Sequence, residues 1–290
     1  MSAPLPDTPC YLNGELLPIA QAKVSVLDRG FIFGDGVYEV IPVYGRIPLR
    51  LDGHLARLGR SLASVRIRNP RTVDEWTALI RDLIARQTFD DQSLYLQVSR
   101  GVAKRDHAFP KDTPPTVFMM VNPLTLPSAD QVSRGVTAVT ATDNRWYRCD
   151  IKSTALLANV MLRQLAVDAG AAEAVLLRDG FLSEGSASNI FVVRDGIVAT
   201  PAKSHLILSG ITYDVITDLA RGDGMTLEQR DVSEAEVRGA DELWLASSTR
   251  EVLAITTLDG KAVGNGRPGP MFERMYRLFR EYTRRLRLSA

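Results

Sequence analysis

A lysine at the start of an apolar helix pattern is the first residue of this sequence that could do covalent chemistry. Lys152 lies in RWYRCDIKSTALLANV, between a strand-like run and a helix that we expect to begin at Ser153 or Thr154. Partial burial and neighbouring cations lower the pKa of an ammonium group, and a free amine condenses with an aldehyde to give a Schiff base. On spacing alone, an ordinary solvated lysine is the commoner interpretation.

A carboxylate and two hydroxyl-rich segments could serve the same chemistry. Glu184 stands in LSEGSASN, where small residues let the backbone approach a ligand, and it could keep the ring nitrogen of a pyridoxal cofactor protonated. SGITYDV at 209–215 and ASSTREV at 246–252 offer loop or helix-start amides with hydroxyls, which bind phosphate. Taken singly, a strand-end glutamate in a polar turn and two ordinary N-caps are the commoner interpretations of these segments.

The composition is that of a globular chain without a strong electrostatic preference. Its 290 residues are enough for about two domains, and 45% hydrophobic with 24% charged residues argue against disorder. Lys and Arg total 35 against 34 Asp and Glu, which leaves a formal charge of +1. This balance disfavours nucleic acid or an anionic membrane as partner and favours a small molecule.

Neither a targeting segment nor a metal signature is visible. No run reaches about 18 apolar residues, and the beginning lacks a basic segment followed by an apolar one, so export and membrane insertion are disfavoured. Cys10 and Cys149, with three histidines, are too few for a disulfide scaffold or a structural zinc site. We therefore expect no metal and a cytoplasmic location, with Cys149 packed in a core and His54 and His205 in structural roles.

The N-terminal half predicts an antiparallel sheet with two helices. Over 11–51, short apolar runs alternate with Asn-Gly, Asp-Gly and Tyr-Gly, the pattern of hairpin-linked strands. Apolar residues over 55–65 share one helical face, and Thr72, with a glutamate three residues later, predicts the capped start of a second helix. Strands over 94–99 and 116–121 follow, separated by the polar loop GVAKRDHAFPKDTPP.

The C-terminal half is also mixed. A strand is expected over 136–140, and EAVLLRDGFLSEGSASNIFVVRDGIVATP carries two strand-Asp-Gly-strand signatures, which are typical of hairpins. A helix at 212–220, a strand at 242–246 and a last helix at 271–286 complete the order. A further helix is expected over 154–169, with an inward face made of Leu156, Leu157, Val160, Met161 and Leu165.

These elements predict an α+β protein of two domains. We expect an N-terminal α/β domain over 1–121 and a C-terminal domain over 132–290. NPLTLPSADQ carries two prolines and little periodicity, so we interpret 122–131 as the interdomain linker.

Several of these segments together resemble a known enzyme family. DRGFIFGDGVYEV, HLARL, SRGVAKRDHAFP, RWYRCDIKS, SEGSASNIF, SGIT and ASST occur in the order and at the spacing of fold-type IV pyridoxal-phosphate enzymes. Within that group the chain is similar to the D-amino acid transaminases, from about Tyr11 to the last helix. The resemblance implies pyridoxal 5'-phosphate as cofactor and a C-terminal cofactor-binding domain with a mixed, β-barrel-like sheet and helices.

The resemblance also implies a role for each candidate residue. Lys152 binds the cofactor aldehyde covalently and works as general base and acid, and Glu184 faces the pyridine nitrogen. Arg57 of HLARL holds the phosphate, and Leu208 lies against the ring. The remaining phosphate ligands are implied to be Ile211, Thr212, Ser248 and Thr249.

Substrate binding is implied to use Tyr38 together with an Arg-x-His loop. Arg105 and His107 of that loop would bind the substrate α-carboxylate with Tyr38, since a planar guanidinium pairs well with a carboxylate. The loop is implied to come from the partner subunit of a homodimer. Two departures stand out: Ala187 replaces a serine frequent in close relatives, and Arg250 could reach either solvent or the substrate side chain.

The implied reaction is a ping-pong exchange of amino groups between D-amino acids, of the D-alanine or D-glutamate type, and 2-oxo acids. Branched-chain L-amino acid aminotransferases, aminodeoxychorismate lyases and (R)-amine transaminases share the fold and stay open as alternatives. A non-catalytic protein that kept the fold is disfavoured by the joint presence of Lys152, Glu184 and Arg57.

Overall fold

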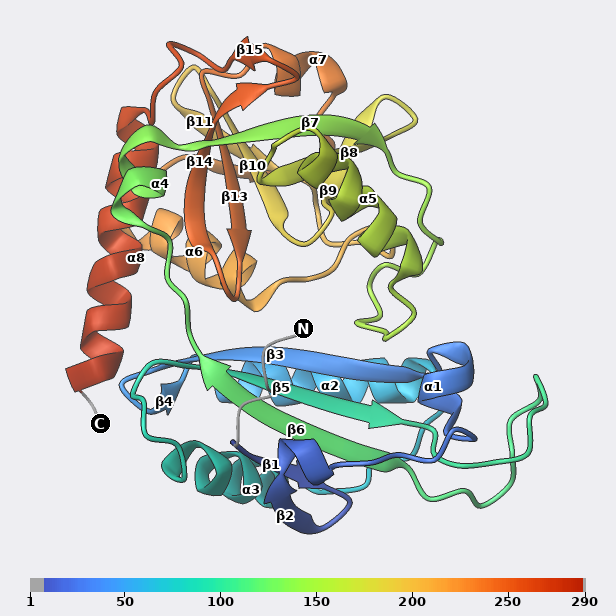
Figure 1. Cartoon of the computed structure of the whole chain (residues 1–290). Coiled ribbons are helices and arrows are strands. Elements are labelled where there is room, and N and C mark those ends of the chain that lie inside the picture. The colour runs from blue at the N-terminus through green and yellow to red at the C-terminus, as the bar shows by residue number, and fades with distance from the viewer. Residues whose placement is uncertain (1–7, 289–290) are drawn as a thin grey trace. The chain divides into compact units, whose positions relative to one another are not determined.

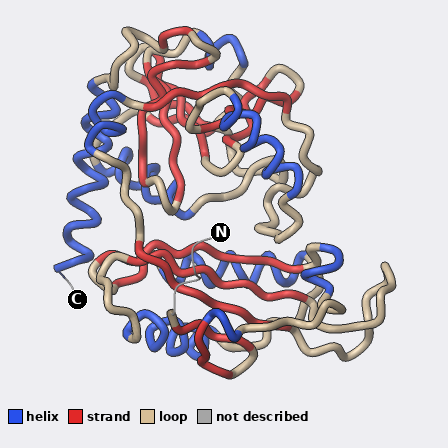
Figure 2. Tube along the Cα trace, in the orientation of Figure 1, coloured by secondary structure: helices blue, strands red, loops and turns tan. Residues whose placement is uncertain are grey.

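A computed structural model describes residues 8–288, which form two compact units. The description that follows treats each unit by itself; Figure 1 labels the elements and Figure 2 separates helices, strands and loops. The domain boundaries expected from composition differ in detail from this grouping, because a short segment after residue 150 and the end of the last helix belong to the first unit. Unit 1 contains 8–124, 151–156 and 285–288, and unit 2 contains 125–150 and 157–284.

Unit 1 is built on a six-stranded antiparallel sheet, as the hairpin pattern predicts. Its strand order is β2-β1-β6-β5-β3-β4. Asn13 and Gly14 join β1 to β2 with φ angles of 50° and 109°, the left-handed geometry that Asn-Gly turns supply. The strands are β1 (Pro9–Leu12), β2 (Glu15–Pro18), β3 (Gly36–Tyr44), β4 (Ile47–Pro48), β5 (Gln92–Ser99) and β6 (Thr116–Pro123).

Two helices, α2 (Leu51–Ser64) and α3 (Val73–Ala85), pack on this sheet through one apolar cluster. The predicted capping box of α3 is present: the Glu75 N–H donates to Thr72 Oγ1 (3.3 Å), and the Thr72 N–H donates to the Glu75 carboxylate (2.7 Å). The predicted helical stripes are confirmed. Their buried members are Leu55, Leu58, Leu62, Trp76, Ile80, Leu83 and Ile84. The 3₁₀ turn η1 (Ile19–Gln21) and the short helix α1 (Arg29–Phe33) precede β3.

Unit 2 is built on a nine-stranded mixed sheet that curls around an apolar core (Figure 1), as the barrel-like expectation requires. The main strand order is β12-β11-β10-β13-β14-β7-β8-β9, and β15 pairs with β14. The strands are β7 (Val136–Thr142), β8 (Glu173–Arg178), β9 (Phe181–Gly185), β10 (Asn189–Arg194), β11 (Ile197–Thr200), β12 (Leu227–Gln229), β13 (Glu242–Ser247), β14 (Glu251–Leu258) and β15 (Lys261–Ala262).

The two Asp-Gly hairpins predicted in this half are confirmed. Asp179 and Gly180 link β8 to β9 with φ angles of 51° and 81°, and Asp195 and Gly196 link β10 to β11 with 50° and 76°. None of the helices among the described residues is long and apolar enough to cross a membrane. Besides α1, α2 and α3, the described residues form the helices α4 (Ala129–Arg134), α5 (Leu157–Asp168), α6 (Ile211–Gly222), α7 (Glu234–Arg238) and α8 (Pro270–Leu288).

The helix expected over 154–169 begins three residues later than predicted. The preceding segment pairs with the start of β3 instead: the Thr154 N–H donates to the Gly36 carbonyl (3.0 Å), and the Thr154 hydroxyl donates to the Gly34 carbonyl (2.8 Å). These hydrogen bonds hold the backbone extended, so α5 starts at Leu157.

The predicted inward face of α5 was wrong. Leu162 and Ala166 are the buried residues of this helix, and they pack in a small cluster with Ala174 and Leu176 of β8. Periodicity misled here because α5 carries apolar residues on more than one face, and contact with the sheet selects only one of them. Leu156 is half-buried, whereas the exposed members of the predicted face are Leu157, Val160, Met161 and Leu165.

Candidate functional site

Lys152 lies in the extended segment that pairs with the beginning of β3. The Tyr38 N–H donates to the Lys152 carbonyl (2.9 Å), and Ser153 forms an isolated bridge with Val37. The Lys152 N–H points to the Ser61 hydroxyl of α2 (3.4 Å). Its Nζ stands 4.4 Å from the centroid of the Tyr38 ring. Unit 1 therefore brings the predicted amine and the predicted tyrosine into contact, with the cation over the aromatic face.

Arg57 lies in α2 and is buried together with Glu39, a carboxylate that the sequence did not single out. Its Nε and Nη2 donate to Glu39 Oε1 (2.8 Å) and Oε2 (2.6 Å). The His54 ring lies 2.8 Å from Oε2 through Nδ1, which must carry the proton because the carboxylate can only accept. His54 Nε2 has no hydrogen-bond partner among residues 8–288. The arrangement fixes the direction of the Arg57 guanidinium.

Strand alternation explains why Glu39 is buried. It shares its face of β3 with Val37 and Ile41, which belong to the cluster under α2, whereas Tyr38 points to the other face. Burial opposes ionisation of Glu39, but Arg57 and His54 outweigh it and lower the pKa of the carboxyl to about 2. Burial in turn lowers the pKa of His54, so the ring is neutral around neutral pH. A lone glutamate inside the apolar run VYEVIPV was the available signal.

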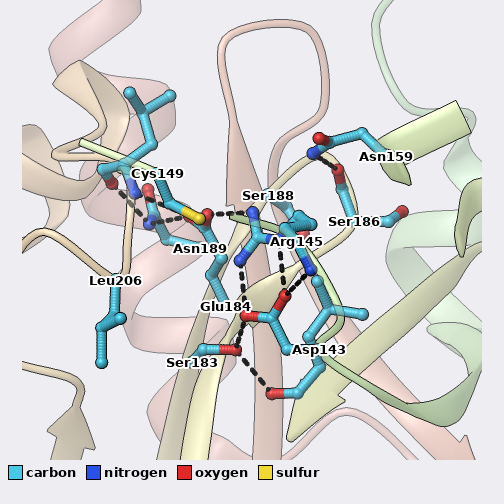
Figure 3. Close-up of polar contacts among 12 residues, drawn as sticks. Asp143, Arg145, Cys149, Asn159, Ser183, Glu184, Ser186, Ser188, Asn189 and Leu206 are labelled. Atoms are coloured by element: carbon cyan, nitrogen blue, oxygen red, sulfur yellow. Dashed lines mark hydrogen bonds and ion pairs between the residues drawn. The ribbon is translucent and has the colours of Figure 1, made fainter. Parts of the chain in front are cut away.

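Glu184 lies in β9 and is bound on both carboxylate oxygens (Figure 3). Arg145 Nη1 donates to Oε1 (2.5 Å), while Asn189 Nδ2 (3.3 Å) and the Leu208 N–H (3.1 Å) donate to Oε2. Arg145 also grips Asp143 through Nε and Nη2, both at 2.9 Å. Unit 2 thus brings together Glu184 and Leu208 from the predicted set and adds an arginine between two buried carboxylates.

The two carboxylates that share Arg145 have opposite pKa shifts. Burial raises the pKa of Glu184, and Arg145 acts against that rise without cancelling it. Burial also opposes ionisation of Asp143, but Arg145 and the Ser183 hydroxyl (2.8 Å) hold the pKa at about 2. Arg178 Nη2 lies 3.0 Å from Asp143 as a second cation. Asp143 is therefore ionised and holds Arg145 in place. The pKa of Glu184 instead depends on the balance between burial, which raises it, and Arg145, which lowers it.

The turn after β9 is held by Glu173 of β8. Both the backbone N–H (3.0 Å) and the hydroxyl of Ser186 donate to Glu173, and so does the hydroxyl of Ser188 (2.8 Å). Ala187 is exposed between them, so the absent hydroxyl lies outside this set of bonds. Arg250 Nη1 donates to the Ala172 carbonyl (2.8 Å) and lies 3.4 Å from Glu173. These contacts of Arg250 are therefore with the first residue of β8 and with the residue before it.

The SGIT segment ends in α6 and contains an unpaired hydroxyl. Gly210 is the N-cap and has no side chain with which to cap the helix. Thr212 Oγ1 is buried and finds no hydrogen-bond partner within residues 8–288. A buried hydroxyl in the first turn of a helix, where the backbone N–H groups and the helix dipole favour an anion, fits a phosphate group. Ile211 and Thr212 therefore suit the phosphate of pyridoxal phosphate.

The ASST segment lies at the turn that joins β13 to β14. Ser248 is half-buried and Thr249 is exposed. Both residues precede Glu251, which has a φ of 52° and lies 3.2 Å from Arg280. The two hydroxyls thus lie on a turn that is followed by an ion pair between Glu251 and Arg280.

Arg105 and His107 lie on the loop between β5 and β6, and both side chains are exposed. They meet at one aromatic ring: Arg105 Cζ lies 5.4 Å and the His107 ring 5.5 Å from the centroid of Phe33. The structure therefore groups these two predicted residues, on a loop of unit 1.

Of the residues predicted to be structural, Cys149 and His54 are buried and His205 is exposed. Cys149 is buried, its Sγ lies 3.2 Å from the Trp146 carbonyl, and burial raises the pKa of its thiol. Cys10 and Cys149 are both free thiols. His205 is exposed, and its carbonyl accepts a hydrogen bond from the Asp150 N–H (3.4 Å).

Comparison with known proteins identifies the family. The model of the amino-transferase class IV family matches residues 36–258. A D-alanine aminotransferase of Bacillus licheniformis is 41% identical over 259 residues, which cover 89% of this chain and 91% of the relative. A D-alanine aminotransferase of Listeria monocytogenes is 37% identical, with 93% and 94% covered. A solved branched-chain amino acid aminotransferase of Escherichia coli superposes with a TM-score of 0.89 at 26% identity, covering 95% of this chain and 94% of that one. The chain belongs to the class IV aminotransferase family.

Proposed function

We propose that this aminotransferase exchanges amino groups between D-amino acids and 2-oxo acids. The observation that carries the proposal is the similarity to D-alanine aminotransferases, which reaches 41% identity over 89% of the chain. Members of the family use pyridoxal 5'-phosphate, which supplies a reactive aldehyde and an electron sink for the substrate Cα. The chain's own groups then choose the substrate and move the proton.

We assign the proton transfer to Lys152. Its Nζ would hold the cofactor through the aldehyde, and the same amine, when free, would take the proton from the substrate Cα. The Tyr38 ring, 4.4 Å from Nζ, limits where that amine can move. Because a base at a single position reaches one face only, the hand of the substrate depends on where its carboxylate is held.

Cofactor binding is assigned to the residues that the resemblance implies. Glu184, held by Arg145, would keep a proton at the pyridine nitrogen, and Leu208 would pack against the ring. Arg57 would take part in binding the phosphate. The other phosphate ligands that we assign are Ile211, Thr212, Ser248 and Thr249.

Substrate carboxylate binding is assigned to Tyr38, Arg105 and His107. A guanidinium presents two parallel N–H groups to a carboxylate, and this gives direction as well as affinity. The Arg105→Ala variant should raise the KM for D-alanine steeply and leave the absorbance of the bound cofactor intact. An unchanged KM would remove Arg105 from the site.

We further propose a homodimer in which the loop over 101–115 serves the site of the partner subunit. Each unit exposes apolar side chains of the kind that an interface covers: Phe31 in unit 1 is 70% exposed, and Leu157 on α5 is 74% exposed. Their exposed neighbours in sequence are Val24, Val26, Leu27, Val160, Met161 and Leu165. Light scattering at twice the mass of one chain is expected, and a monomer would contradict this assembly.

Mixing two defective variants tests whether the site is shared. Lys152→Ala removes the amine, and Arg105→Ala removes the carboxylate ligand. If the loop serves the partner, a mixed dimer contains one site with both groups intact, and activity at low substrate concentration reappears after the two variants are exchanged. If each loop serves its own subunit, no mixed dimer has an intact site and activity stays low.

A substrate panel tests the reaction itself. Purified protein with pyridoxal phosphate and 2-oxoglutarate should convert D-alanine to pyruvate, and Lys152→Ala should not. Transfer from L-leucine alone would favour a branched-chain enzyme, transfer from (R)-amines alone an amine transaminase, and release of 4-aminobenzoate from aminodeoxychorismate a lyase. Any of these three results would overturn the D-amino acid proposal.

We also propose a cytoplasmic location. Cys10 and Cys149 are both unpaired, and free thiols are typical of proteins in a reducing compartment. Cell fractionation with a marker enzyme for each compartment would test this, and recovery outside the cytoplasm would contradict it.

A further inference from the structure

The loop that carries Arg105 and His107 is tied to a buried arginine at the start of α1. Arg29 is 3% exposed, and its guanidinium faces the backbone of this loop. Nη1 donates to the carbonyls of Asp106 (2.5 Å) and Ala108 (3.3 Å), and Nη2 to the carbonyl of His107 (3.5 Å). One guanidinium thus binds three consecutive carbonyls, those on either side of His107 and its own.

The position of Arg29 is itself fixed by a carboxylate. Asp35 accepts from Arg29 Nε (2.7 Å) and from Arg100 Nε (2.7 Å) and Nη2 (2.9 Å). Burial opposes ionisation of Asp35, but the two guanidiniums outweigh it and lower its pKa. Arg100 also lies with Cζ 3.7 Å from the centroid of Phe109, the next residue of the loop. Two arginines joined by one aspartate therefore hold the loop from 106 to 109.

The ends of the loop are tied to the same helix. Asp28, the N-cap of α1, accepts from the hydroxyl of Ser99 at the end of β5 (2.7 Å) and from that of Thr116 at the start of β6 (2.6 Å). Phe33 lies at the other end of α1. Its ring centroid is 4.8 Å from Arg29 Cζ, 5.4 Å from Arg105 Cζ and 5.5 Å from the centroid of the His107 ring. α1 is thereby a platform for the loop, which Figure 1 shows projecting past the ends of β5 and β6.

We propose that Arg29 is a positioning residue that sets the affinity and the hand of the substrate by fixing the carboxylate-binding loop. The proposal rests on the proposed function, because it needs Arg105 and His107 to bind the substrate. Four of the five N–H groups of Arg29 already donate to Asp35 and the loop, so its contacts are structural ones. The fork geometry matters: a lysine offers a point charge and cannot bind Asp35 and three carbonyls together.

The test compares Arg29→Gln and Arg29→Lys with Arg60→Gln, a control at an exposed arginine of α2. In Arg29→Gln we expect the KM for D-alanine to rise on the order of tenfold to a hundredfold, with kcat nearly unchanged. The preference for D- over L-alanine should fall, and cofactor absorbance should stay that of the wild type. The KM of Arg29→Lys should lie between those of the wild type and Arg29→Gln, and the KM of Arg60→Gln should match the wild type.

Limited trypsin digestion reports on the loop independently of activity. Lys104, Arg105 and Lys111 are cleavage points within it, and release of the loop in Arg29→Gln should speed cleavage there. Faster cleavage with a raised KM supports the proposal. An unchanged KM in the folded variant, or a raised KM without faster cleavage, overturns it.

A second variant keeps the proposal falsifiable if Arg29→Gln fails to fold. Phe33→Leu removes the ring that contacts Arg29, Arg105 and His107 but leaves the ion pair between Arg29 and Asp35 in place. It should also raise the KM while kcat holds; an unchanged KM overturns the positioning role of α1. The Arg105→Ala variant distinguishes a failure of the proposed loop function from a failure of the positioning role of Arg29. If Arg105→Ala leaves the KM unchanged, the proposed function of the loop fails, whatever digestion shows for Arg29.

Discussion

Arg145 binds Glu184 with an Nη1 to Oε1 distance of 2.5 Å while its Nε and Nη2 bind Asp143 at 2.9 Å each. One guanidinium therefore neutralises two buried carboxylates and joins the strand that carries Glu184 to the segment after β7. An unpaired buried carboxylate is costly, so this contact allows Glu184 to lie at the site in a defined orientation.

Arg145→Gln should weaken both the fold and the cofactor site. Removing one partner from a buried ion pair costs about 3–5 kcal/mol, and urea unfolding should show a loss of that order. Glu184 without Arg145 should be neutral over a wider pH range, since burial already raises its pKa, and equilibrium dialysis should show weaker cofactor binding. Arg148→Gln breaks an exposed pair with Asp150 and should change stability by less than about 1 kcal/mol. Equal losses in the two variants would contradict the role of Arg145.

The sequence predicted local features well because they depend on neighbouring residues. The Asp-Gly hairpins, the capping box at Thr72 and the stripes of α2 and α3 each follow from backbone geometry within a few positions. The inward face of α5 did not, because Leu157 and Leu162 are equally apolar and only the sheet decides between them. Face selection is a tertiary effect.

The partners of the candidate residues were also out of reach of the sequence. Lys152, Glu184 and Arg57 were singled out by motif, but the motifs did not show that Glu39 binds Arg57 across 18 positions of the chain or that Arg145 binds Glu184 across 39. Such pairs depend on which strands and helices pack together, and the hydrophobic periodicity of a segment does not predict that packing. A charged residue inside an apolar run, as at Glu39, is the one local sign that a buried partner exists.

Acid should destabilise the protein partly through Glu39. Its pKa falls from an ordinary value of 4.5 to about 2, so the folded form binds this proton less readily than the unfolded chain. The resulting stabilisation, on the order of 3 kcal/mol, is complete above about pH 5 and is lost as the pH falls toward about 2.

Glu39→Gln isolates that contribution. The neutral amide should make the variant less stable than the wild type near neutral pH, because Arg57 and His54 lose their anion. The difference should shrink as the pH falls, since the wild-type carboxyl becomes neutral as well. Unfolding midpoints in urea over a pH series measure this, and a difference that stays constant down to about pH 3 would exclude Glu39 as the group involved.

Gly210→Ala should disturb the cofactor site through Asn189. A Cβ at Gly210 would collide with Asn189 Oδ1, and Asn189 donates to both Glu184 and the Leu208 carbonyl. The φ of Gly210 is −68°, so the cost is collision and not backbone strain. We expect weaker cofactor binding and lower stability. Gly222→Ala, at the other end of α6, meets nothing within 4 Å and should be neutral or stabilise by up to about 1 kcal/mol.

Thr212→Val separates a ligand-binding hydroxyl from a structural one. The Thr212 hydroxyl is buried and has no partner among residues 8–288, so its removal should leave the stability of the cofactor-free protein unchanged or raise it. If the hydroxyl donates to the phosphate, cofactor affinity should fall about tenfold, as expected for a hydrogen bond to a charged group.

Thr217→Val is the matched control five residues further along α6. The Thr217 hydroxyl donates to the Tyr213 carbonyl (2.8 Å), so its loss should lower stability by about 1 kcal/mol with cofactor affinity unchanged. Thermal unfolding of the cofactor-free protein and equilibrium dialysis with pyridoxal phosphate give the two readouts. The opposite pattern, in which Thr212→Val is less stable but binds the cofactor normally, would place the phosphate elsewhere. It would mean that the Thr212 hydroxyl stabilises the fold and does not bind the phosphate.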